Sequence, residues 1–116
     1  MSLIKDLNEK KQLMYITPRQ SFWEKLKLSV EGEYPGITAF VEQNYKSLTI
    51  KDLHLFWLLS ARVSPQIIKL CMNYSSAVTV SNYKRILIRE LMGLDMKFDQ
   101  FLQLYLDGKY ELLTKN

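Results

Sequence analysis

Apolar residues recur along most of the chain at spacings of three and four, which is the period of an amphipathic α-helix. No segment of the sequence shows the strict alternation of apolar and polar residues that is typical of a β-strand. We therefore expect an all-α fold of about six helices, in which 17–116 forms a single domain. The segment 1–16 has a narrow apolar stripe between charged flanks, which predicts a helical extension that acts as a coiled coil or a packing arm.

The residues between these segments have the chemistry of helix caps. Thr17 followed by Pro18 should open a helix that ends by Gly32. Thr49 and Asp52 have the spacing of a capping box, with aspartate in place of the preferred glutamate. The helices expected after residue 16 are 18–32, 37–45, 50–61, 65–73, 76–92 and 96–106.

The segment 50–61 is apolar on most sides, so we expect it at the centre of the core. Trp57 lies in its most apolar part and should be buried against the helices over 65–73 and 76–92. Asp95 is expected to cap the last helix. The tail from 107 to 116 should be weakly ordered, since it carries no clear helical pattern.

The chain offers little that could support catalysis. Cys71 is the only cysteine and is interpreted as a small buried hydrophobe, while His54 has no cluster of acids or cysteines at ligand spacing. A glycine-rich phosphate loop and a nucleophile elbow are both absent from the sequence. We therefore expect a protein that is not an enzyme and that uses no cofactor and no metal.

Charge and hydropathy add a mild constraint on location and partners. The 116 residues carry a net charge of +4, which permits contact with nucleic acid without requiring it. No run approaches 18 apolar residues, and charges follow Met1–Ile4 at once, so neither a membrane span nor a signal peptide is apparent. We expect the domain to work in the cytoplasm without touching a membrane, alone or as part of a larger membrane-anchored protein.

The order of elements over 48–94 is a long helix, a short helix, a tight turn at Tyr74-Ser75-Ser76 and a longer helix. This is the spacing of a helix-turn-helix. In such a motif the second helix, here 76–92, lies in the major groove of DNA.

A series of positions in this segment follows one recurring motif: Leu48-Thr49, Asp52, Leu58-Leu59, Ser64, Gln66-Ile67-Ile68, Leu70, Ser76, Thr79-Val80 and Leu91–Gly93. These residues resemble the LuxR/GerE pattern, which is roughly L-T-x-x-E, an apolar run, S-x-x-E-I-A-x-x-L, S-x-x-T-V and K-L-G. The stretch Tyr34-Pro35-Gly36, with Phe40 and Tyr45–Thr49, is similar to the C-terminal module of Bacteroidetes tetratricopeptide-repeat transcription regulators. The resemblance covers about 22–106 and implies a winged-helix-like, LuxR-type helix-turn-helix core with an N-terminal helical extension.

The chain also departs from that pattern. Arg62 replaces a glycine, while Gln66 and Ile68 replace a glutamate and an alanine. Ser81 and Tyr83 stand where basic residues are expected after T-V. The second helix of the motif is one residue longer than in the pattern.

The resemblance implies a DNA-binding output module of a bacterial transcription regulator, which contacts double-stranded DNA and dimerises through its N-terminal helix. Helical geometry places Val80, Tyr83, Leu87 and Leu91 on the core face of 76–92. The expected DNA-binding residues are Ser75, Ser76, Thr79, Ser81, Asn82, Lys84, Arg85 and Arg89.

An alternative stays open, because Val78, Ile86 and Met92 are expected on the outward face or its flank. Apolar residues in such number fit a protein partner better than thymine methyl groups. In that interpretation the chain is a degenerate helix-turn-helix that serves as a protein–protein interaction module.

Overall fold

The computed structural model describes residues 18–114, and within this range it is entirely helical, as expected. It contains six α-helices, one π-helical segment and one short 3₁₀ helix. The α-helices are α2 (Gln20–Glu33), α3 (Ile37–Asn44), α4 (Ile50–Ser60), α5 (Pro65–Met72), α6 (Ala77–Arg85) and α7 (Phe98–Leu106). The π-helical segment is η1 (Ile86–Leu91), and the 3₁₀ helix is η2 (Tyr110–Leu112). The expected helix over 1–16 and its candidate coiled-coil contacts lie outside the described residues.

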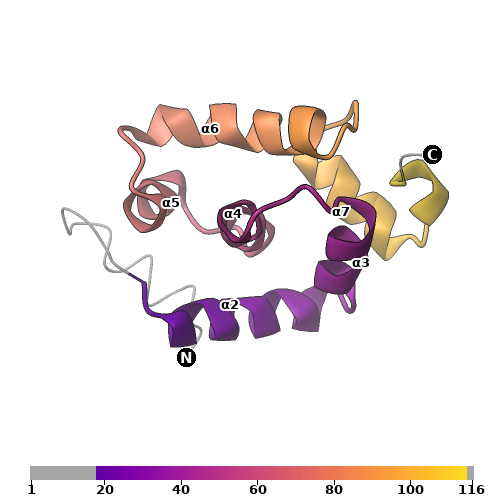
Figure 1. Cartoon of the computed structure of the whole chain (residues 1–116), viewed down its shortest axis with the longest axis horizontal. Coiled ribbons are helices and arrows are strands. Elements are labelled where there is room, and N and C mark those ends of the chain that lie inside the picture. Colours follow the sequence, from indigo (N-terminus) through magenta and orange to yellow (C-terminus); the bar gives the residue numbers. More distant parts are fainter. Residues whose placement is uncertain (1–17, 115–116) are drawn as a thin grey trace.

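The helices are stacked so that α2 and α6 lie at opposite sides of the molecule, with α4 and α5 between them (Figure 1). α2 packs against α3 and α4, and α5 packs against α4 and α6. α3, α7 and the C-terminal segment gather at one end (Figure 1). One long side of α6 therefore faces away from the rest of the fold.

α4 forms the centre of the core, as its composition predicted. The ring of Phe56 packs edge-on against Phe98 and Phe101 of α7, with centroids 5.4 and 6.0 Å apart. Trp57 is buried, and its indole N–H donates a hydrogen bond of 3.0 Å to Thr38 Oγ1. The burial of Trp57 is confirmed, and its indole N–H is bonded to α3, which was not among the neighbours expected for it.

Two of the expected helix starts are confirmed. The capping box at α4 is complete: Thr49 N donates to Asp52 Oδ2 (2.8 Å), and Asp52 N donates to Thr49 Oγ1 (3.2 Å). α5 begins with Pro65 directly after Ser64. Proline suits this position because the first helical N–H has no partner within the helix.

Two other helix starts differ from the expectation. Pro18 precedes α2, which begins at Gln20 after the extended residue Arg19. Asp95 does not cap α7, because Lys97 occupies the N-cap position. The side chain of Leu94 is buried, so the connecting chain first turns inward and runs further before α7 begins.

The C-terminal segment is packed rather than weakly ordered up to Thr114, which corrects the expectation. Leu113 is fully buried, and its carbonyl oxygen accepts a hydrogen bond from the Tyr45 hydroxyl. Burial raises the pKa of Tyr45 to about 12. A single buried leucine after a short 3₁₀ turn gives no periodic signal, so the sequence pattern did not reveal this contact.

The helix expected over 76–92 is continuous to Leu91 but changes from α to π after Arg85. Met92 N donates to Leu87 O at 2.9 Å, five residues back, where an α-helix would bond four back. This wider turn accommodates an extra residue and rotates the positions that follow it. Met92 is consequently buried, whereas Leu91 is 37% exposed, which reverses the expected placement of both.

Tyr83 also lies outside the core, contrary to the expectation. It is 41% exposed, and its ring stacks on Tyr74 of the preceding turn with centroids 4.5 Å apart. The inward positions of the continuous helix are instead Val80, Leu87 and Ile88. A tyrosine satisfies this position because its ring can cover the turn while its hydroxyl stays in water.

Candidate functional site

The connection between α5 and α6 determines how α6 is presented. Asn73 has a left-handed backbone with φ 57°, and Tyr74 N donates to Lys69 O at 2.9 Å. Asparagine tolerates this conformation better than most residues, so α5 can end abruptly. In Figure 1, α5 is seen end-on whereas α6 lies in the plane, so the chain changes direction sharply between them.

Arg62, at the other end of α5, has φ 59° and is likewise left-handed. This is the position where the pattern that the chain resembles carries glycine. The backbone conformation that glycine favours is therefore present, although an arginine occupies it.

Three hydroxyl groups meet at the start of α6. Ser76 precedes the first helical residue, and its Oγ lies 3.1 Å from Thr79 Oγ1. Ser75 Oγ lies 3.5 Å from the same Thr79 oxygen. Three of the predicted site residues are thus brought together beside the N-terminal end of a helix, where backbone N–H groups and the helix dipole favour an anion.

The outward side of α6 and η1 carries the polar residues that the helical pattern placed there. Ser81, Asn82, Arg85 and Arg89 are all exposed, and Val78 is 74% exposed. The two arginines differ in their surroundings. Arg89 Nη1 lies 3.7 Å from Asp95 Oδ1, while Arg85 has no ion-pair partner among residues 18–114.

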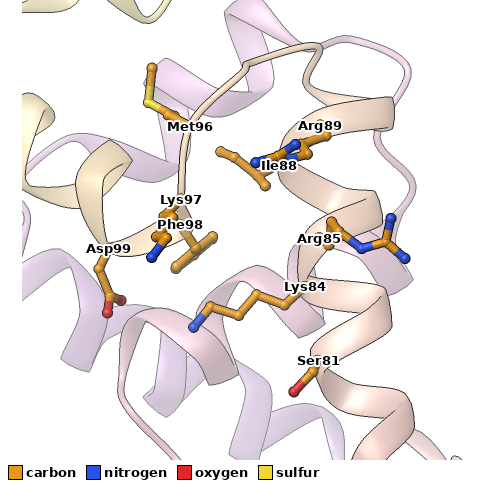
Figure 2. A pocket seen from close by; sticks show the side chains of 9 residues that line it. All are labelled: Ser81, Lys84, Arg85, Ile88, Arg89, Met96, Lys97, Phe98 and Asp99. Carbon is orange, nitrogen blue, oxygen red and sulfur yellow. The ribbon is translucent and has the colours of Figure 1, made fainter.

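Beside this surface lies a cleft of ≈ 290 Å³ between the α6–η1 helix and the segment that leads into α7 (Figure 2). Lys84 reaches into the cleft, and Arg85 points away from it (Figure 2). The lining residues are Ser81, Lys84, Arg85, Ile88, Arg89, Met96, Lys97, Phe98 and Asp99.

Lys97 and Asp99 were not among the DNA-binding residues expected from the sequence. They precede or begin α7, far along the chain from Arg85, and no periodic pattern links the two segments. Only the turn after η1, where Gly93 adopts φ 70°, brings the segment back beside α6.

A smaller hollow of ≈ 180 Å³ lies elsewhere along the same helix. Ile86, which was expected outward or on the flank, is half-buried and lines it together with Tyr83 and Leu91. The remaining lining residues are Lys51, Asp52, Leu55, Met72, Tyr74 and Leu87.

The side chains of His54 and Cys71, which could in principle be reactive, are packed among other residues of the fold. His54 stacks on Trp23 with ring centroids 3.7 Å apart and planes 3° apart, and burial lowers its pKa. Cys71 is half-buried, and burial raises the pKa of its thiol to about 12, so the reactive thiolate is disfavoured. Within residues 18–114 no group of three His, Cys, Asp or Glu could hold a metal ion. No helix in the same range is long and apolar enough to cross a membrane.

Comparison of the chain with protein-family models, with curated proteins and with solved structures finds no match.

Proposed function

We propose that the chain is the DNA-binding output module of a bacterial transcription regulator, with α5, its turn and α6 acting as a helix-turn-helix. The observation that carries the proposal is the outward side of α6 and η1, where Ser81, Asn82, Arg85 and Arg89 are exposed at one edge of the molecule. The resemblance of 48–94 to the LuxR/GerE pattern supports the same function.

The chemistry of these residues suits base recognition. The major groove is about 12 Å wide and admits an α-helix. Arginine pairs bidentately with guanine and asparagine with adenine, so Arg85 and Asn82 are the proposed base readers. The hydroxyls of Ser75, Ser76 and Thr79 are proposed to meet phosphate oxygens at the start of the helix.

The arrangement of apolar residues also supports DNA over a protein partner on this surface. Of the three apolar residues expected outward, Met92 is buried and Ile86 is half-buried, which leaves Val78 on the exposed side. A single valine can contact a thymine methyl group, whereas a protein partner needs a larger apolar area.

In this proposal the segment 1–16 provides a dimer contact, and the domain works in the cytoplasm without a cofactor, a catalytic step or a membrane contact. Dimerisation would place two recognition helices on half-sites about 34–36 Å apart, so the preferred DNA sequence should have two-fold symmetry.

The second candidate is a protein–protein interaction module, and a specific observation favours it. Tyr83 and Leu91 are 41% and 37% exposed beside the hollow that Ile86 lines. An apolar side chain of a partner could enter there. This candidate uses a different part of the helix from the DNA proposal, so variants can separate the two.

Selection from a random DNA library at two salt concentrations, followed by sequencing, tests the proposal. We expect enrichment of one motif and, for three to five neutralised phosphates, a slope of log affinity against log salt of roughly −3 to −5. The variant Arg85→Ala should relax the enriched motif at one position, whereas Leu91→Ser, in the hollow, should keep the whole motif. Absence of DNA binding at low salt would contradict the proposal and favour the interaction module.

A further inference from the structure

The cleft beside α6 has two walls that come from separate parts of the chain. Lys84 and Arg89 belong to the α6–η1 helix, and Lys97 belongs to the segment that leads into α7. In Figure 2 the side chain of Lys84 extends across the space toward the segment that carries Lys97 and Asp99. Neither ammonium has an ion-pair or hydrogen-bond partner among residues 18–114. Two cations therefore line one space, and neither forms an ion pair with the one carboxylate there, Asp99.

The floor and the charge balance of the cleft strengthen the positive potential of these two lysines. Ile88 and Phe98 line it and are each only 2% exposed, so the cleft rests on the apolar core. A low-dielectric wall beside charged groups focuses their potential. Four cationic side chains line the cleft, but Arg85 points away from it and Arg89 lies beside Asp95. Lys84 and Lys97 therefore face one carboxylate, Asp99, which leaves a net excess of one positive charge.

We propose that this cleft binds a phosphate group, held between the ammonium groups of Lys84 and Lys97. The inference rests on the proposed function for the source of the phosphate, which is the DNA backbone. Phosphates border the major groove on both sides, so a helix lying in the groove has a backbone beside it. Lys97 occupies that flank and so positions the domain without reading sequence.

Asp99 makes the proposal sharper, because its carboxylate lies on the same cleft with the opposite charge. If a phosphate enters, Asp99 repels it. Removing the charges of Lys97 and Asp99 should therefore change DNA affinity in opposite directions. A purely structural effect on the loop before α7 would not predict this pair of signs.

The experiment measures the affinity of the full chain for the selected duplex and for a scrambled duplex at several salt concentrations. The variants are Lys97→Gln, Asp99→Asn and a matched control, Lys25→Gln, in α2 on the opposite side of the molecule. We expect Lys97→Gln to weaken binding to both duplexes by about three- to tenfold and to reduce the salt slope by about one. Asp99→Asn should tighten binding to both, and Lys25→Gln should leave it unchanged.

The outcomes separate this inference from the proposed function. If the parent selects a motif but Lys97→Gln behaves like Lys25→Gln, the phosphate site is wrong and the DNA proposal stands. If the parent binds no DNA, NMR titration with pyrophosphate decides. Shifts at Lys84 in the parent that vanish in Lys97→Gln would support the cleft with a free phosphate compound as its source. Absence of those shifts would overturn it.

Discussion

The two sides of the molecule use their polar side chains differently. On the side of α2 and α3, polar groups are bound within the fold: the Glu31 carboxylate accepts hydrogen bonds from Gly36 N and Thr38 N, both at 2.8 Å. Thr38 in turn accepts the indole N–H of Trp57. On the side of α6, Asn82 and Arg85 are exposed, and no hydrogen bond joins their side chains to another of the described residues.

This difference separates residues that hold the fold together from residues available to a ligand. A buried polar group must be paired, because leaving it without a partner costs about 1–3 kcal/mol. An exposed arginine or asparagine stays bonded to water and adds little to stability. Substitutions near α2 and α3 should therefore act on unfolding, and those on α6 should act on binding.

The largest expected effect on stability is at Trp57. The substitution Trp57→Ala removes a buried ring and leaves the Thr38 hydroxyl without its donor, so the free energy of unfolding should fall by about 3–5 kcal/mol. Urea denaturation followed by circular dichroism measures this. Trp57→Phe keeps an aromatic ring and should cost less, and because the indole faces α3, the folded variant should bind DNA as the parent does. A loss of DNA affinity in folded Trp57→Phe would contradict the division between residues that stabilise the fold and residues that bind a ligand.

Most of the fold could be predicted from the sequence because proline, glycine and cap residues mark where the helices begin and end. Helix periodicity gave the six described α-helices, and the Thr49–Asp52 box fixed the start of α4. The π-helical turn could not be read from periodicity, which assumes a constant rotation per residue. The placements of Leu91 and Met92 failed for that reason.

The candidate site was predicted only in part for a related reason. Residues on one helix, such as Asn82 and Arg85, share a face that the helical period reveals. Lys97 joins them through a tertiary contact between η1 and the start of α7, and nothing local in the sequence encodes that contact. The direction of Trp57 was missed likewise, since α4 is apolar on nearly every side.

The next effect concerns the two arginines of the α6–η1 helix. Arg85 is exposed and unpaired among the described residues, so Arg85→Ala should cost roughly 1–3 kcal/mol on the preferred duplex and relax selectivity at one base. Arg89 is next to Asp95 and nearer the C-terminal end of the helix. Arg89→Ala should weaken binding to duplexes of every sequence alike and reduce the slope of log affinity against log salt by about one.

Titrations of each arginine variant against specific and scrambled duplexes measure this difference. Neither substitution should alter the free energy of unfolding by more than about 0.5 kcal/mol, since both side chains are at the surface. If both variants bind both duplexes as well as the parent does, this surface does not touch DNA. Tyr83, Ile86 and Leu91 would then become the residues to mutate.

Glu31 provides a smaller effect that depends on pH. Burial opposes ionisation of its carboxyl, but hydrogen bonds from Thr38 and Gly36 outweigh burial and hold its pKa below the ordinary value of 4.5. The unfolded chain therefore binds the proton first as pH falls. The stability that Glu31 contributes is complete above about pH 4.5 and is lost as pH falls through the folded-state pKa.

The substitution Glu31→Gln tests this by removing the charge and keeping the size. At pH 7 it should lower the free energy of unfolding by about 1–2 kcal/mol, the value of charge-assisted bonds to backbone N–H groups. The deficit relative to the parent should shrink in urea titrations below pH 4.5. Glu24→Gln, at an exposed position of α2, is the matched control for the loss of a glutamate charge. A deficit that is constant with pH would mean that the carboxylate charge is not responsible.

The smallest expected effect concerns the backbone of the turn between α5 and α6. Asn73 is left-handed with φ 57°, a conformation that costs most residues about 1–2 kcal/mol and costs glycine almost nothing. Asn73→Ala should therefore destabilise the fold by up to about 1 kcal/mol. Asn73→Gly should stay within about 0.5 kcal/mol of the parent, because its easier backbone is offset by a more flexible unfolded chain.

The matched control for Asn73 is Ser29, an exposed position inside α2. At Ser29 the alanine variant should be the more stable of the two, because glycine within a helix destabilises it by about 1 kcal/mol relative to alanine. Urea denaturation of the four variants gives both orders in one experiment. If the alanine variant is more stable than the glycine variant at both positions, the chain between α5 and α6 is not held left-handed at Asn73. The sharp turn that presents α6 would then need another cause. If the orders are opposite, the turn is encoded by one residue, and the DNA affinity of Asn73→Gly should equal that of the parent because no charge or α6 side chain has changed.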